Sequence, residues 1–314
     1  MFLCVSLNPA IDKRLKLAHL RLGQVNRATE VSPAPGGKAA HVAMVLRTLG
    51  ADPVWLGFAG GPTGVALVEG LNAMSIRVEA VTTESATRMN LEIVENDGEV
   101  TEILEPGQPV TREELERLQN AFEQAVRRFA GKTTAILSGS LPSSVPEDYY
   151  ATLVGLGHQH GCRMFVDTSG EPLRLALKAN PELVKPNQQE AERLSECAIN
   201  GLRSAESALN MILSAGAKAG AISLGADGLV WRSANEERVL HAKVPQFVVR
   251  SAVGSGDATM AGFAFAADQG LEPEESLRLA AACGAANCLA EGPGRARAND
   301  IARLKNKIAV EILQ

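Results

Sequence analysis

The chain has 314 residues, 46% of them hydrophobic and 21% charged, and a net charge of −5 at pH 7. This length suits one large α/β domain or two ordinary ones, and the acidic balance argues against a nucleic-acid partner, because such proteins usually carry a basic surface. The sequence has neither a signal peptide nor an apolar run near the roughly 18 residues of a membrane-spanning helix, so we expect a cytoplasmic protein without a membrane partner.

Short apolar runs rich in β-branched residues alternate with helical patterns along most of the chain. This alternation predicts a mostly parallel sheet with helices on both faces, which is a three-layer α/β fold. In such sheets ligands bind at the carboxyl ends of the strands. We expect strands at residues 2–7, 54–59, 135–138, 163–167, 183–184 and 219–224, and helices at 37–49, 64–74, 147–158, 255–268, 274–290 and 300–312.

One region breaks this alternation and predicts a small antiparallel sheet. Residues 89–95 and 99–104 alternate polar and apolar side chains on either side of Asp97-Gly98, which is a hairpin signal. Residues 11–17 also alternate, and residues 25–31 complete the set. We expect one domain over residues 1–314, with a lid from about residues 11–34 and 87–105; an edge extension or a dimer contact is the alternative.

The most informative motif is Gly254-Ser255-Gly256-Asp257, which leads into a run of small apolar residues. Free N–H groups at a helix start can hold an anion, and glycines let the backbone approach it closely. An aspartate beside such a cradle can take a proton from a hydroxyl during phosphoryl transfer. The alternative is a glycine-rich turn with an acid that favours the helix dipole.

Two further motifs stand at the starts of predicted helices. Gly36-Gly37-Lys38 brings a cation to a flexible turn, which suits a phosphorylated ligand or only a strand-to-helix turn. Asn187 and Glu190 follow the strand at 183–184 with the spacing of a capping box. Their oxygens can equally hold hydrated Mg²⁺.

Two strand ends offer small polar residues. Ser138 follows the strand at 135–138 and can donate to an anion or satisfy the local backbone. The run Ser223 to Gly228 can form a turn around a nucleotide phosphate or only a hairpin.

Taken together, these motifs resemble the ribokinase-like (PfkB) sugar-kinase family. The resemblance spans nearly the whole chain, with the motifs in family order. Within the family, Asn8-Pro9-Ala10-Ile11-Asp12, Thr87-Arg88-Met89-Asn90 and Asp97-Gly98-Glu99-Val100-Thr101 are similar to the branch of 1-phosphofructokinase and tagatose-6-phosphate kinase.

The resemblance implies ATP and Mg²⁺ as cofactors, a sugar phosphate as substrate, and a homodimer formed through the lid. It implies that Asp257 is the general base and that the amides of Gly254, Ser255 and Gly256 form the anion hole. It implies that Asn187 and Glu190 organise Mg²⁺. The residues implied at the nucleotide are Lys185, Asn187, Ser223, Gly225, Gly228 and, near the adenine, Asn287.

For the sugar, the resemblance implies a polar pocket with a separate phosphate clamp. The branch usually has glycine and asparagine where this chain has Ala39 and His41. Because that asparagine touches sugar hydroxyls, the larger His41 predicts a pocket of different shape. The His41 ring can still donate a hydrogen bond to a hydroxyl. The implied sugar ligands are Asp12, Gly36, Gly37, Lys38 and His41, and the implied phosphate ligands are Arg88, Asn90 and Ser138.

The sequence therefore predicts an ATP-dependent kinase for a phosphorylated ketohexose, with fructose 1-phosphate as the first choice. Tagatose 6-phosphate is the close alternative, and a related sugar kinase of altered specificity is another. A sugar-phosphate sensor without catalysis is the alternative from a different class. Retention of Asp257, Asn187 and Glu190 argues against it, because a sensor needs none of them.

Overall fold

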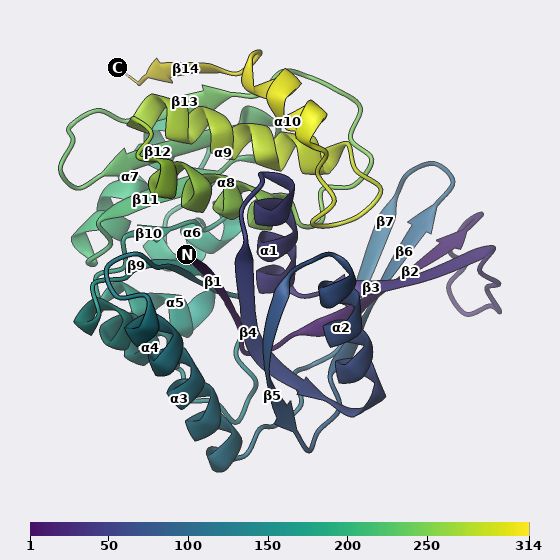
Figure 1. Cartoon of the computed structure of the whole chain (residues 1–314). Coiled ribbons are helices and arrows are strands. Elements are labelled where there is room, and N and C mark those ends of the chain that lie inside the picture. Colours follow the sequence, from purple (N-terminus) through teal and green to yellow (C-terminus); the bar gives the residue numbers. More distant parts are fainter. Residues whose placement is uncertain (314) are drawn as a thin grey trace.

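The centre of the molecule is a ten-stranded sheet (Figure 1). The structure, a computed structural model, describes residues 1–313. In the order in which they lie across the sheet, its strands are β14 (Ala309–Ile312), β13 (Leu240–Lys243), β12 (Leu229–Ser233), β11 (Ala219–Ser223), β10 (Leu183–Val184), β9 (Arg163–Asp167), β8 (Thr134–Ser138), β1 (Phe2–Ser6), β4 (Pro53–Gly60) and β5 (Arg77–Thr83).

From β11 to β5 every neighbouring pair in this sheet is parallel, and β12, β13 and β14 add an antiparallel edge. Buried parallel strands read as continuous apolar runs, which is why the strand positions could be predicted from the sequence. The carboxyl ends of β8, β9, β10 and β11 lie along one edge, and Ser138, Asp167 and Lys185 stand there.

Helices cover both faces of the sheet, and each face has its own apolar core. Trp55 of β4 is fully buried in one core and Phe122 in the other; burial of one such side chain contributes about 1.5–3 kcal/mol. This confirms the predicted three-layer α/β fold. One face carries α1 (Lys38–Thr48), α2 (Gly61–Ala73), α8 (Ser255–Gln269), α9 (Pro273–Cys288) and α10 (Ala298–Lys305), and the other α3 (Arg112–Arg128), α4 (Tyr149–Gln159), α5 (Gly170–Leu177), α6 (Gln188–Ser195) and α7 (Leu202–Ser214).

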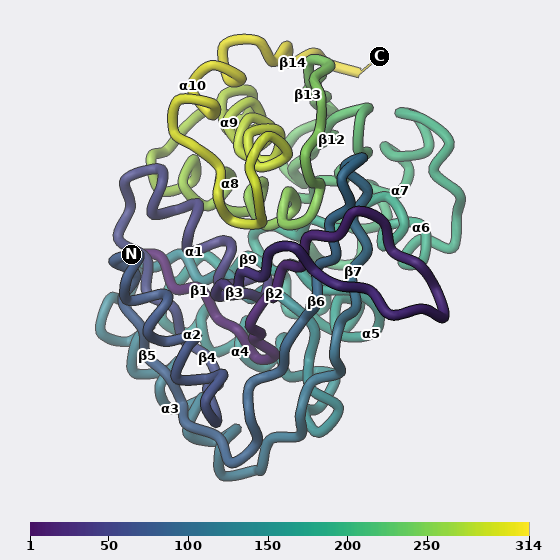
Figure 2. Tube along the Cα trace, turned by 90° about the vertical axis from the view of Figure 1, so that its right-hand side faces the viewer, coloured from purple at the N-terminus to yellow at the C-terminus, as the bar shows by residue number. Residues whose placement is uncertain are grey.

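A separate four-stranded sheet, called here the lid sheet, stands at the side of the molecule that faces the viewer in Figure 2. The predicted Asp97-Gly98 hairpin joins two of its strands. The lid sheet is mixed rather than antiparallel throughout, because β2 and β6 pair in parallel. Its strands in order are β3 (Glu30–Gly36), β2 (Ala10–Leu17), β6 (Arg88–Glu95) and β7 (Val100–Leu104).

Two elements differ from the sequence prediction by several residues. The segment expected at 25–31 pairs instead over Glu30–Gly36, and its two prolines are tolerated because β3 is an edge strand. The helix expected at 300–312 ends at Lys305, and Ala309–Ile312 is the edge strand β14. The strand pairs antiparallel with β13, Ala309 opposite Lys243 and Ile312 opposite Leu240. Within residues 1–313, none of the helices is both long and apolar enough to cross a bilayer.

Candidate active site

The glycine motif forms the first turn of α8, as predicted. Gly254 caps the helix with φ 76°, a left-handed conformation that favours glycine, and a Cβ added there would lie 2.6 Å from Pro293 Cβ. The first N–H groups of a helix have no partner within it and carry partial positive charge. Asp257 lies in this turn and is 5% exposed, so a buried carboxylate stands in the first turn of the helix, where Ser255 N already donates to Ala252 O at 3.1 Å.

Two side chains from other elements hold or face this loop. The Asn287 side-chain amide on α9 donates to Val253 O at 2.8 Å and lies 3.4 Å from Ser255 Oγ. Lys185 comes from the carboxyl end of β10, and its Nζ would lie only 3.1 Å from a Cβ added to Gly256. The ammonium group of Lys185 therefore lies against the glycine backbone at the start of α8.

Asp167 at the end of β9 is the buried partner of two lysines. Its Oδ1 lies 3.2 Å from Lys38 Nζ and its Oδ2 lies 3.6 Å from Lys185 Nζ. Burial alone would raise the pKa of Asp167, but the charges of Lys185 and Lys38 lower it below its ordinary value. Sequence reasoning did not select Asp167. The signal available was an acidic residue at the carboxyl end of a buried parallel strand.

Lys38 also interacts with two carboxylates outside this pair, those of Asp257 and Glu190. Burial would lower the pKa of Lys38, but the charge of Asp167 raises it, with further contributions from Asp257 and Glu190. Lys38 contacts Asp167 at the end of β9, and the charges of Asp257 in α8 and Glu190 in α6 act on it from further away. A phosphate group near Lys38 would meet a cation that remains protonated at neutral pH.

Asp12 and Asn90 face each other across the β2–β6 pair of the lid sheet. Asn90 Nδ2 donates to Asp12 Oδ1 at 2.9 Å. A Cβ added to Gly36 would lie 2.3 Å from Asp12 Cγ, so only glycine at position 36 leaves room for this carboxylate. Burial would raise the pKa of Asp12, but its contact with His41 and its hydrogen bond with Asn90 lower it.

His41 lies in the first turns of α1 and is 5% exposed. Its Nδ1 lies 2.8 Å from Asp257 Oδ2 and its Nε2 lies 2.9 Å from Asp12 Oδ2. A single ring therefore joins the residue predicted to be the base to a residue predicted to hold the sugar. Both ring nitrogens are engaged by protein carboxylates, which differs from the sugar contact that the sequence suggested.

The predicted phosphate ligands Arg88 and Ser138 stand near the start of β6 and the end of β8. The Arg88 guanidinium donates to Glu105 O at 2.6 Å and to Asn8 O at 3.2 Å, and its Nε is buried with no partner in residues 1–313. Ser138 Oγ and Asn90 Oδ1 are likewise buried and unpaired within the described part of the chain. Buried polar atoms without a partner are uncommon, and a bound ligand is one way to satisfy them.

Asn187 and Glu190 form the predicted capping box at the start of α6. Asn187 Oδ1 accepts from Glu190 N, and Glu190 Oε2 accepts from Asn187 N, both at 2.8 Å. The other predicted nucleotide turn is a hairpin between β11 and β12, with a short 3₁₀ turn at Gly225–Asp227. Ser223 pairs with Asn187 in an isolated parallel bridge, so the two segments are adjacent.

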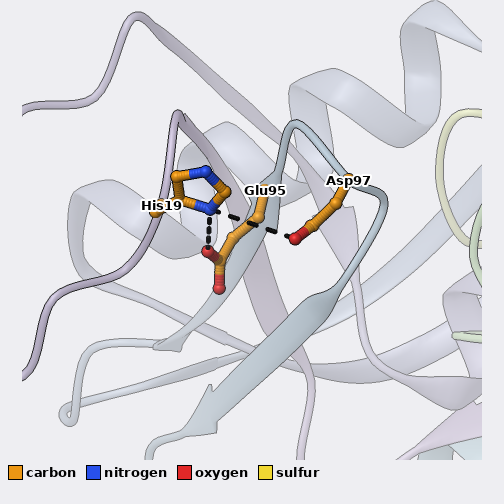
Figure 3. Close-up of side chains that lie close together, drawn as sticks. All are labelled: His19, Glu95 and Asp97. Carbon is orange, nitrogen blue, oxygen red and sulfur yellow. Dashed lines mark ion pairs between the residues drawn. The ribbon is translucent and has the colours of Figure 1, made fainter.

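A different group of ionisable side chains occupies the tip of the lid sheet (Figure 3). His19 Nδ1 lies 3.4 Å from Glu95 Oε2 and 3.9 Å from Asp97 Oδ2. Glu95 Oε2 also accepts a hydrogen bond from Leu20 N at 2.8 Å. These contacts fasten the chain that follows β2 to the β6–β7 hairpin, at a largely exposed position.

Solved structures and curated relatives define the class and then the family. The fold is ribokinase-like: the phosphofructokinase-2 of Escherichia coli, solved in complex with fructose-6-phosphate, matches with a TM-score of 0.89 and 27% identity, with 98% of each chain covered. The chain belongs to the pfkB family of carbohydrate kinases, whose sequence model matches residues 5–299. The family resemblance predicted from the motifs is thereby confirmed.

Two curated relatives carry different activities at almost the same similarity. The 1-phosphofructokinase of Borreliella burgdorferi is 30% identical over 92% of each chain. The tagatose-6-phosphate kinase of Staphylococcus epidermidis is 29% identical over 99% of each chain. The predicted class of enzyme, a carbohydrate phosphotransferase, is confirmed by the family, while these two relatives give no preference between the two sugars.

Proposed function

We propose that the protein is an ATP- and Mg²⁺-dependent kinase for a phosphorylated ketohexose. Fructose 1-phosphate, giving fructose 1,6-bisphosphate, is the first choice, and tagatose 6-phosphate is the second. One observation carries this proposal: the buried Asp257 carboxylate stands in the first turn of α8 next to the Gly254–Gly256 backbone. Relatives of both activities support the two sugars about equally.

The step needs a base for the acceptor and positive charge for the phosphoryl group. Asp257 takes the proton from the sugar hydroxyl while the hydroxyl oxygen forms a bond to the γ-phosphorus of ATP. The bond from that phosphorus to the β–γ bridging oxygen breaks, and ADP leaves with the electron pair. The α8 N–H groups and Lys185, 3.1 Å from the Cβ position of Gly256, stabilise the charge on the transferred group.

The side-chain oxygens of Asn187 and Glu190 at the start of α6 fit Mg²⁺, because this ion prefers oxygen ligands. Each oxygen that Asn187 and Glu190 use in the capping box keeps a lone pair, and the Glu190 carboxylate has a second oxygen. These two residues would hold the ion, directly or through water. When bound, Mg²⁺ supplies charge that neutralises the nucleotide phosphates.

The phosphate already present on the sugar would bind to Arg88, Asn90 and Ser138, with Lys38 nearby. Two buried donor groups without a partner in residues 1–313 support this assignment, Arg88 Nε and Ser138 Oγ, and Asn90 would donate through its Nδ2. The sugar itself would lie between this clamp and Asp257, against Asp12, Gly36 and Gly37.

We also propose a homodimer formed through the lid sheet. Its edge strands and their ends expose large apolar side chains: Val31 is 50% exposed, Ile103 51% and Leu104 59%. Val31 lies on β3, and Ile103 and Leu104 lie on β7, so both edge strands of the lid sheet carry exposed apolar side chains, and an edge strand can pair with a second chain. A tetrameric inhibited form is known for the phosphofructokinase-2 of Escherichia coli, at 28% identity and a TM-score of 0.89.

A substrate panel tests the proposal. Purified protein is mixed with ATP and MgCl₂, and ADP release is followed with fructose 1-phosphate, tagatose 6-phosphate, fructose 6-phosphate, free hexoses and nucleosides. We expect the highest kcat/KM with fructose 1-phosphate or tagatose 6-phosphate. Activity confined to unphosphorylated sugars or nucleosides would reject the substrate class.

Replacing the base tests the mechanism. Asp257→Asn should lower kcat by about 10²–10⁴-fold, because an amide does not accept the hydroxyl proton. ATP binding, measured by calorimetry, should remain close to wild type. Asp268→Asn changes an exposed aspartate near the other end of α8 and serves as the matched control. Substantial kcat in Asp257→Asn would show that another group is the base.

A further inference from the structure

The His41 side chain contacts two carboxylates at the centre of the site described above. It comes from α1, Asp12 comes from β2 of the lid sheet, and Asp257 comes from α8. The two nitrogen–oxygen distances are 2.8 and 2.9 Å, and the ring is buried. Such short contacts at both ends of a buried ring fix its position and its orientation.

With both carboxylates ionised, this geometry requires a doubly protonated ring. An ionised carboxylate only accepts hydrogen bonds, and a neutral imidazole has a single N–H, so one contact would otherwise bring two acceptors together. Burial alone would lower the pKa of His41, but the hydrogen bonds and charges of Asp12 and Asp257 outweigh it and raise that pKa to about 10. His41 is therefore an imidazolium throughout the neutral range.

The two carboxylates differ in how many of their oxygens accept hydrogen bonds from protein side chains. Asp12 Oδ2 accepts from His41 and Asp12 Oδ1 accepts from Asn90, so each oxygen of Asp12 is held by one protein group and keeps one lone pair. On Asp257 only Oδ2 is held by His41, which leaves Oδ1 for a hydroxyl group. Asp12 thus serves as the anchor of the imidazolium, and Asp257 keeps one oxygen for chemistry.

Other charged groups surround this trio. Lys38 on α1 interacts with Asp257, and Arg88 on β6 interacts with Asp12. Glu102 on β7 faces His41 from further away. Since each carboxylate of the trio has a second cation nearby, loss of the imidazolium leaves neither of them without a positive neighbour. A neutral substitution at position 41 should therefore be compatible with folding.

We propose that His41 is a positioning residue for the transfer step, an inference that rests on the kinase function proposed above. It holds Asp257 by one carboxylate oxygen and keeps the other turned toward the acceptor hydroxyl. Through Asp12 and Asn90 it ties this orientation to the lid sheet. His41 keeps both of its protons during the reaction, and the hydroxyl proton goes to Oδ1 of Asp257.

Kinetics of His41→Asn test this role. Asparagine can donate to one carboxylate but not to both, and it carries no charge. We expect kcat to fall by about 10- to 100-fold, as small misplacements of a catalytic group do, with KM for ATP unchanged. The control is His158→Asn, which removes another imidazole–carboxylate contact, at 3.0 Å to Glu182 on the other side of the sheet. We expect that variant to keep wild-type kcat.

A second measurement tests the bridge without any assay of activity. The His41 ring is followed by NMR during a pH titration of the wild-type protein, with its signals assigned by comparison with His41→Asn or, should that variant not fold, His41→Gln. We expect protonation to persist to about pH 10. In Asp12→Asn, removal of one negative partner should lower the pKa of His41 by about 1–3 units.

The two measurements separate failure of this inference from failure of the kinase proposal. If the wild-type protein phosphorylates no sugar phosphate, the proposed function fails, and the titration alone decides whether the bridge exists. A His41 that titrates near pH 6.5, or one that does not respond to Asp12→Asn, overturns the bridge. Wild-type kcat in a folded His41→Asn overturns the positioning role.

Discussion

Replacing Asp167 with asparagine should destabilise the protein more than any surface charge change, because it leaves a lysine buried without its partner. The Asp167 side chain is 1% exposed and that of Lys185 is 3% exposed, whereas Lys38 is 37% exposed and can turn toward water. Breaking a buried ion pair by removing one partner costs about 3–5 kcal/mol. Since Lys38 escapes most of that cost, we expect Asp167→Asn to lower the free energy of unfolding by about 3 kcal/mol.

Urea unfolding followed by far-ultraviolet circular dichroism at pH 7 measures this change. The matched control is Asp52→Asn, because Asp52 pairs with Arg47 but its side chain is 91% exposed, and such pairs contribute at most about 1 kcal/mol. Adding Lys185→Met to Asp167→Asn should recover part of the loss, because the unpaired charge is then gone. Equal effects of Asp167→Asn and Asp52→Asn would refute the reasoning.

The same ion pair predicts a pH dependence. The pKa of Asp167 is lowered in the folded protein, so its stabilisation is complete above the ordinary aspartate range near pH 4 and is lost as the pH falls further. Wild type should therefore lose stability more steeply than Asp167→Asn below about pH 4. Parallel curves for the two proteins would contradict the shift.

Three further changes test the packing, the phosphate clamp and the charge of His41. Gly262→Ala should destabilise the protein by about 1–3 kcal/mol, because the added Cβ would lie 2.6 Å from Ala280 Cα. The control is Gly155→Ala in α4, which should stabilise slightly because its added Cβ would have nothing within 4 Å. Equal shifts in melting temperature for the two variants would argue against tight α8–α9 packing. Arg88→Ala should raise KM for the sugar phosphate and not for ATP, and the reverse pattern in steady-state kinetics would reject the clamp. Because the folded pKa of His41, about 10, lies above its unfolded value, its stabilisation is full below about pH 6.5 and disappears toward pH 10. The gap in melting temperature between wild type and His41→Asn should close over that range, and a constant gap would count against the shift.

Much of the fold could be predicted because its signals are local. The strand at 163–167 lies where its run of apolar residues placed it, and the hairpin turn forms at Asp97-Gly98. The end of the chain shows the limit of such signals. Residues 306–312 read as the continuation of a helix, but β13 offered an unpaired edge, and pairing with that edge satisfies the backbone of β14.

The site residues also fall into those that the local sequence predicts and those that only folding brings together. Gly254 and Asp257 could be found because the helix start, the glycine and the acid lie within four consecutive residues. Asp167 could not be found in this way, because its two partners are 18 residues away in Lys185 and 129 residues away in Lys38. No sequence pattern near Asp167 indicates that the side chains of Lys38 and Lys185 both contact it.

His41 lies between these cases. The sequence marks it as a departure from the usual pattern, but not what it contacts, since Asp12 is 29 residues away and Asp257 is 216 residues away. Once those contacts are known, its effect follows from charge: the buried Asp257 and the partly buried Asp12 share one cation, so they cannot be changed independently. A substitution at Asp12 alters the charge next to His41 and, through the ring, the orientation of Asp257. Residues that the sequence divides between sugar binding and catalysis are therefore one hydrogen-bonded unit in the folded chain, and their single substitutions should not combine additively.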